Sequence, residues 1–131
     1  MSKRLILVVT ASILMLLISG CTSCDLEGYK DSVNPIIQKW DDAESLALSS
    51  PRIALAPQIE NLQEIKREAE NLKIPECTQK VHKYLVASMD STIDAFLAFL
   101  QQDDNESKSQ MLEAKDQMYY YLDELKGLEE K

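Results

Sequence analysis

Apolar residues along this chain recur at steps of three and four, the spacing of one face of an α-helix. From residue 25 onward the pattern falls into four segments that are separated by proline or by polar residues. The segments lie at about 25–49, 51–74, 76–102 and 107–127. No run alternates polar and apolar residues as a half-buried strand would. The pattern therefore predicts an all-α protein.

Each segment carries an apolar stripe that would face a shared core. In chain order the stripes are Tyr29, Val33, Ile36, Ile37, Trp40, Ala43 and Ala47; Leu55, Ile59, Leu62, Ile65, Ala69 and Leu72; Val81, Leu85, Met89, Ile93, Phe96 and Leu100; and Met111, Ala114, Met118, Tyr121, Leu125 and Leu128. Helices of this length with short loops are expected to form an up-down-up-down four-helix bundle. The first and third helices would then begin at the same end.

Local signals refine where the helices begin and end. Pro35 is expected to kink the first helix or, with Asn34 as its cap, to begin the main part of it. The second helix should become regular near Pro57. A polar loop is expected at 101–106, after which Ser107 begins a Ser-Lys-Ser-Gln sequence that resembles a capping box.

The first 20 residues differ in kind from the rest of the chain. A Lys-Arg pair at 3–4 precedes a stretch of 14 residues, 5–18, that is apolar apart from two hydroxyl side chains. This composition is typical of a secretory signal peptide, and the stretch is shorter than the roughly 20 residues of a membrane-spanning helix. The small residues at 19–20 before Cys21 suit cleavage by a signal peptidase.

The sequence Ile18-Ser19-Gly20-Cys21 resembles the lipobox of bacterial lipoproteins. The resemblance implies that residues 1–20 are removed and that Cys21 carries a diacylglyceryl group. Residues 21–131 would then form a mature domain held by lipid on the non-cytoplasmic side of a membrane of the cell envelope. Thr22 follows in place of an inner-membrane retention Asp, which implies the outer membrane where the organism has one. The alternative is an ordinary signal peptide that ends at a cysteine by chance.

The remaining two cysteines, Cys24 and Cys77, are expected to form a disulfide in an oxidising compartment. The bundle topology would bring them to the same end, and closing a loop of about 53 residues stabilises a fold by roughly 4 kcal/mol. The alternative is two free thiols. Cys21 and Cys24 cannot form a redox-active pair, because the sulfur of Cys21 would carry the lipid. They cannot attach a haem either, because Asp25 stands where a His is required.

The charge of the chain limits its partners. It has 14 basic and 22 acidic side chains, a net charge of −8. Without the Lys-Arg pair of the leader, 12 basic side chains face 22 acidic ones, and the net charge becomes −10. Nucleic acid and anionic lipid would repel such a body, so the expected link to the membrane is the lipid on Cys21.

No arrangement of residues predicts a reaction, a metal or a cofactor. His82 is the single histidine and lies in no Glu-x-x-His pair, so it is expected to be solvated or satisfied by neighbours. The carboxylate pairs Asp90/Asp94 and Glu60/Glu64 fall on polar faces. A Gly-x-Ser-x-Gly sequence is absent. We expect no enzyme activity.

Three apolar or aromatic residues outside the stripes are candidates for a partner surface: Leu46, Ile53 and Tyr120. The first two belong to the end of the bundle farthest from Cys21, where they could instead seal the core. Tyr120 is expected to face outward, and its neighbour Tyr119 to flank the buried stripe. The sequence favours a non-enzymatic interaction or structural module whose partner is another envelope protein. The alternative is a carrier that binds a small apolar ligand between the helices near Trp40.

Overall fold

The computed structural model describes residues 24–130, so the predictions for the leader, Cys21 and Thr22 lie outside the described part. Four α-helices make up most of it: α2 (Leu26–Ser49), α3 (Ala56–Glu70), α4 (Gln79–Leu100) and α5 (Asp104–Glu129). Two short 3₁₀ turns, η2 (Arg52–Ala54) and η3 (Glu76–Thr78), precede α3 and α4. Residues 24–130 contain no strand, and the predicted all-α helical bundle is confirmed.

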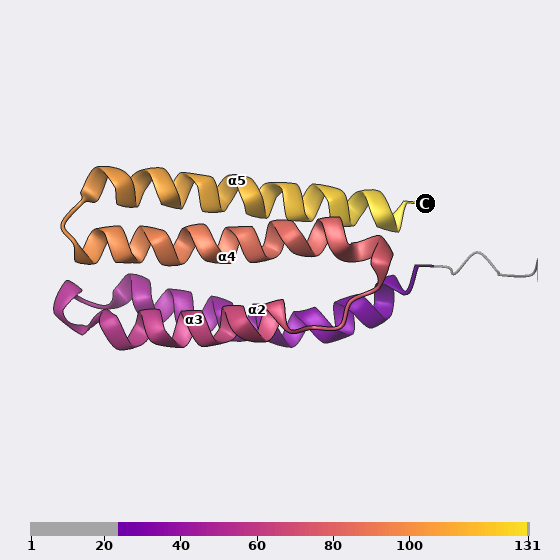
Figure 1. The fold of residues 1–131 in the computed structure, drawn as a ribbon, viewed down its shortest axis with the longest axis horizontal. Coiled ribbons are helices and arrows are strands. Elements are labelled where there is room, and N and C mark those ends of the chain that lie inside the picture. The colour runs from indigo at the N-terminus through magenta and orange to yellow at the C-terminus, as the bar shows by residue number, and fades with distance from the viewer. Residues whose placement is uncertain (1–23, 131) are drawn as a thin grey trace, which may run out of the picture.

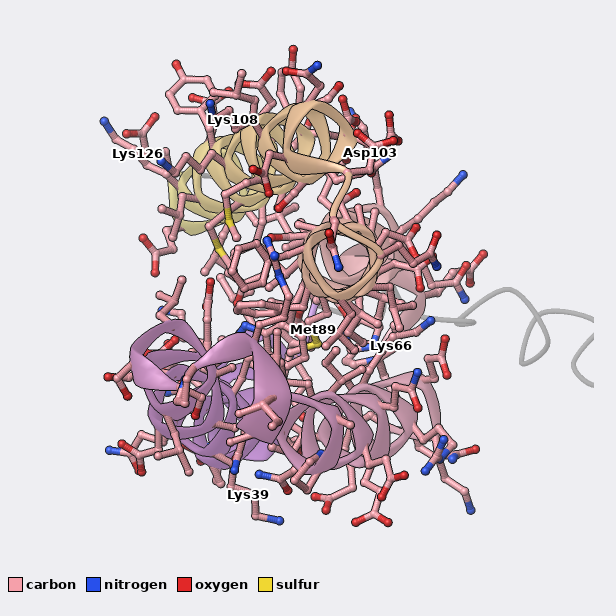
Figure 2. The ribbon with its side chains drawn as sticks, turned by 90° about the vertical axis from the view of Figure 1, so that its left-hand side faces the viewer. Lys39, Lys66, Met89, Asp103, Lys108 and Lys126 are labelled. Atoms are coloured by element: carbon pink, nitrogen blue, oxygen red, sulfur yellow. A yellow bond between two sulfur atoms is a disulfide. The ribbon has the colours of Figure 1, made fainter. Side chains whose placement is uncertain are left out.

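The four helices lie along one long axis (Figure 1). The α2–α3 connection and the α4–α5 turn lie at one end, which we call the tip. Residue 24, η3 and the end of α5 lie at the other end, the base. Helix α4 packs against both α3 and α5, whereas α5 packs mainly on α4. Figure 2 views the bundle from the tip, with α5 on top of α4 and the α2–α3 pair beneath.

The core is built from the predicted stripes of α2, α3 and α4. Its largest fully buried apolar side chains are Tyr29, Val33, Leu55, Leu62, Val81, Leu85 and Met89. Helix α5 contributes less, because only Ala114 and Tyr121 of its predicted stripe are buried. Met118, Leu125 and Leu128 pack on the core but remain half-buried. Helix α5 is therefore the least covered of the four.

Helix α2 runs through Pro35 without interruption, so the alternative in which Asn34 caps a main part that begins at Pro35 is wrong. Proline removes one backbone hydrogen bond, but Val33 and Ile36 are buried on either side of it and hold the helix to the core. The N-cap is Asp25, whose carboxylate accepts a hydrogen bond from the Gly28 N–H at 3.0 Å.

The helix ends differ from the sequence-based predictions at two places. Helix α3 ends at Glu70, about four residues early, because the Asn71 side chain donates to the carbonyl of Arg67 at 2.8 Å. Helix α5 begins before the predicted cap, Ser107. Its N-cap is Asp103, which accepts from the Glu106 N–H at 3.0 Å. Acidic side chains suit the positive end of a helix, and half of the predicted polar loop, residues 104–106, is helical.

Two links fasten the base of the bundle. Cys24 and Cys77 are joined by a disulfide, with their Cα atoms 5.8 Å apart, so the predicted pairing fits the structure. This bond ties the start of α2 to η3. Lys30 of α2 forms an ion pair with Glu129 near the end of α5. Within residues 24–130, no helix combines the length and the apolar character that a membrane span requires.

Candidate functional site

The tip carries the two aliphatic residues that the sequence singled out. Leu46 lies one turn before the end of α2 and is 51% exposed, while Ile53 lies in η2 and is 95% exposed. Leu48, which was not among the predicted candidates, is also more than half exposed, but it points to another side of α2 than Leu46 does. Exposure of this extent argues against the expectation that Leu46 and Ile53 seal the core.

Local hydrogen bonds fix the turn that presents Ile53. The hydroxyls of Ser49 and Ser50 both donate to the carbonyl of Leu46, at 3.0 and 2.7 Å. They satisfy one of the free carbonyls at the end of α2. Pro51 follows in an extended conformation and starts η2. The connection is thus held by its own backbone and hydroxyl groups rather than by burial of Ile53.

Arg52 joins this connection to the α4–α5 turn. Its guanidinium carbon lies 4.1 Å from the centre of the Phe99 ring, a cation–π contact. Its Nη2 lies 3.2 Å from Asp104 Oδ1. Its Nε is buried and has no acceptor among the described residues. Arg52 therefore holds the two halves of the tip together while one of its donors stays unpaired.

A pocket of about 230 Å³ lies next to this contact, between α2, α4 and α5. Its lining residues are Ala47, Leu48, Ser50, Leu55, Phe96, Phe99, Ser107 and Met111. Most of these side chains are apolar, and two hydroxyls supply the polar groups. Pockets for drug-sized ligands usually measure about 300 to 1,000 Å³, so this one suits an inserted side chain better.

Tyr120 does not belong to the tip surface. It lies in the middle of α5, where its ring packs against Tyr84 of α4 with centroids 5.5 Å apart. It is 48% exposed, whereas Tyr119 is 66% exposed. The expectation that Tyr119 flanks the buried stripe is wrong, because Tyr119 lies about 200° around the helix from the buried Tyr121 and therefore points to solvent.

His82 is buried and its two ring nitrogens are both satisfied. Nε2 lies 2.9 Å from the carbonyl oxygen of Ala69, which can only accept, so Nε2 carries the proton. Nδ1 is then free to accept from the Tyr29 hydroxyl at 3.3 Å. Burial lowers the pKa of His82 below its usual value. Of the two expectations for this residue, the satisfied histidine is the one that the structure bears out.

Trp40, near which the carrier alternative placed a ligand, is buried in the core. Its indole N–H donates to Glu44 at 3.1 Å. Burial raises the pKa of Glu44, although the bond from Trp40 opposes the shift, and burial also raises the pKa of Asp41. Neither carboxylate has a nucleophile or histidine beside it among the contacts of the described residues. In that part of the chain, no three His, Cys, Asp or Glu side chains gather as metal ligands would.

Sequence reasoning missed two features of this molecule. The first is the contact of Arg52 with Phe99 and Asp104, which joins residues about 50 positions apart and leaves no local pattern. The second is a run of exposed residues along α5 at steps of three and four, which is visible in the sequence once lysines are counted together with apolar residues. Comparisons of the chain with known protein families, with curated proteins and with solved structures found no match.

Proposed function

We propose that this chain is a lipid-anchored protein of the bacterial envelope whose helical bundle presents its tip to another envelope protein. The anchor would be Cys21, as the resemblance to the lipobox implies. The chain enters the bundle at the base, and Ile53 lies at the opposite end of α2 (Figure 1). A helix of 24 residues spans about 36 Å, so the bundle would hold the tip that far from its base.

The near-complete exposure of Ile53, on a turn fixed by Arg52, is the observation that carries this proposal. An isoleucine exposed to water gains free energy when a partner covers it. The fixed turn lowers the entropy that binding would cost. Leu46 and Leu48 are further exposed apolar side chains at the end of α2, and the pocket beside Leu48 can accept one side chain of the partner. Since the described residues offer no catalytic arrangement, binding is the activity that these groups support.

Crosslinking in native membranes tests the docking surface. A photo-reactive amino acid at residue 53 should capture one main protein, identified by mass spectrometry. Capture should fail when Leu46→Asp is added and should persist with Gln38→Asp, which adds the same charge to an exposed position of α2 remote from the tip. All variants should keep the helical circular dichroism of the parent. Equal capture by the two variants would refute the tip as the docking surface.

The anchor is tested separately. Mass spectrometry of the mature protein should find acyl groups on its N-terminal Cys21, and Cys21→Ser should leave an unprocessed precursor. An unmodified Cys21 would refute the anchor without affecting the result at the tip. The second candidate is a carrier of a small apolar molecule, bound in the tip pocket and not near Trp40 as first expected. The apolar lining of that pocket favours it. Native mass spectrometry that finds a bound small molecule, lost in Met111→Asp, would favour this carrier function over docking.

A further inference from the structure

Helix α5 has a second stripe on the side that faces water. Its members follow one another at steps of four, three, four, three and four, and every one of them is exposed. The outer stripe consists of Lys108, Leu112, Lys115, Tyr119, Leu122 and Lys126. Figure 2 shows Lys108 and Lys126, its two ends, on the same side of α5 and turned away from the other helices. This surface is separate from Leu46 and Ile53 at the tip.

The steps of the outer stripe are those of a helix–helix seam. Alternating steps of four and three keep residues on one line along a helix, and a second helix packs against such a line. The buried stripe of α5 has the same alternation and is filled by the core. From Lys108 to Lys126 the outer stripe extends about 27 Å, a length that a partner helix of five turns would cover. Leu112, Tyr119 and Leu122 are each more than half exposed along it.

Two of the three lysines of the outer stripe lack the carboxylate partners that several other lysines of the protein have. Lys39, Lys66 and Lys80 each reach a carboxylate on a neighbouring helix. In contrast, Lys108 and Lys115 pair with no carboxylate among the described residues, although the chain has 22 acidic side chains. Lys126 reaches only the exposed Glu130, at 3.8 Å.

The helical neighbours of Lys115 explain why it is unpaired. The residues three and four positions away on either side are Met111, Leu112, Met118 and Tyr119, and none is charged. An ion pair along the helix requires an acid at one of these positions. Lys115 is therefore a cation within an apolar surface, and a carboxylate that approaches this surface meets no competing acid on the seam.

We propose that the outer stripe of α5 binds an amphipathic α-helix of another protein, one that presents carboxylates to Lys108, Lys115 and Lys126 and apolar side chains between them. The regular steps call for a helix, and the lysines call for acidic residues at the facing positions. A second copy of this chain is the wrong occupant. In a parallel pairing each lysine would face its own copy, and in an antiparallel pairing about the centre of the stripe Lys108 would face Lys126.

The edges of the outer stripe orient the partner helix. Asp116 and Asp123 border the stripe on one side and are exposed. On the other side lie Met118 and Leu125, which pack partly on the core. The aspartates of the first edge repel an acidic helix, whereas the uncharged side chains of the second edge do not. It should therefore lie toward the methionine side of α5.

Two designed peptides test this proposal against the purified domain. Each peptide has three heptads, with leucine at the seam positions that face Leu112, Tyr119 and Leu122. At the seam positions that face Lys108, Lys115 and Lys126, one peptide has glutamate and the other has lysine. Fluorescence anisotropy of the labelled peptides should show binding of the glutamate peptide only. Lys115→Glu should weaken that binding by about tenfold or more, and changing all three lysines of the stripe to glutamate should create binding of the lysine peptide. Lys83→Glu is the matched control, since Lys83 is an exposed lysine of α4 outside the stripe, and it should leave both affinities unchanged.

Several outcomes would overturn the proposal. One is no binding of the glutamate peptide at millimolar protein, and another is equal binding by the parent and Lys115→Glu. Sedimentation that shows a dimer disrupted by Leu112→Asp would assign the stripe to a second copy. Binding to vesicles of phosphatidylglycerol and phosphatidylcholine that is lost in Lys115→Glu would assign it to a lipid surface. Circular dichroism checks that each variant stays folded, which we expect because every substituted side chain is exposed.

Discussion

Loss of the Cys24–Cys77 bond should destabilise the bundle strongly. The bond closes a loop across 53 positions of the chain. Closing a loop of this length lowers the entropy of the denatured chain by about 14 cal/mol/K, which raises its free energy by about 4 kcal/mol at room temperature. A domain of about 107 residues is typically stable by about 5 to 15 kcal/mol, so one bond accounts for a large share of the total.

This loss can be expressed as a change in melting temperature. Unfolding of about 107 residues carries an entropy of about 0.22 kcal/mol/K, so 4 kcal/mol corresponds to a fall of about 18 °C. The assay is thermal unfolding followed by circular dichroism, with and without a reductant, of the chain that begins at residue 22. That chain lacks Cys21 and contains only one cysteine pair. Non-reducing peptide mapping should recover Cys24 and Cys77 in one linked fragment.

Serine variants separate the bond from other roles of the two residues. Cys24→Ser, Cys77→Ser and the double variant should all melt at about the same reduced temperature, because each removes the same bond. The reductant should have no further effect on any of them. If the losses of stability in the two single variants added up in the double variant, each cysteine would be acting alone. Such a result, or a parent that the reductant leaves unchanged, would refute both the bond and the loop argument.

Three further predictions concern named side chains. Burial lowers the native pKa of His82 below its unfolded value of 6.5. The stability that comes from this shift is therefore complete above about pH 6.5 and is lost as the pH falls through the native pKa. Urea unfolding between about pH 7.5 and pH 5 should show this dependence of stability on pH, and His82→Gln should reduce it. Asp103→Ala should cost about 1 kcal/mol in the same assay, since it removes the N-cap of α5, and no change would refute the cap. Leu85→Ala in the core should cost about 2 to 5 kcal/mol, whereas Leu112→Ala on the outer stripe should change stability by less than about 0.5 kcal/mol.

Helices α2, α3 and α4 were predictable because one signal dominates each of them. Their apolar residues lie on a single face, and that face is buried in the structure. Helix ends were less predictable, because caps depend on one or two hydrogen bonds that compete with similar ones nearby. Ser107 and Asp103 both stand at the start of an acceptable cap, and the structure uses Asp103, which lengthens α5 by one turn.

The candidate sites depend on contacts between distant residues, which the sequence does not reveal. The prediction that His82 could be a satisfied histidine was correct, but its partners could not be named, because Tyr29 lies 53 positions away. The packing of Tyr120 on Tyr84 was not predictable either, since the two residues lie 36 positions apart. In contrast, the exposure of Tyr119 follows from the sequence, because it lies about 200° around the helix from Tyr121 of the predicted stripe.

The contacts that hold the helices together are concentrated at the base of the bundle, and both proposed surfaces lie away from them. The base is held by the disulfide, by Lys30 with Glu129 and by the buried bonds of His82. The tip is held mainly by Arg52, and among the described residues no ion pair or ring contact joins the outer stripe of α5 to another helix. A rigid base allows apolar side chains elsewhere to stay exposed, because the core does not need them for stability. Their exposure then favours binding, because each partner side chain that covers them removes apolar surface from water. Little conformational entropy is lost in this step, since the helices are already ordered.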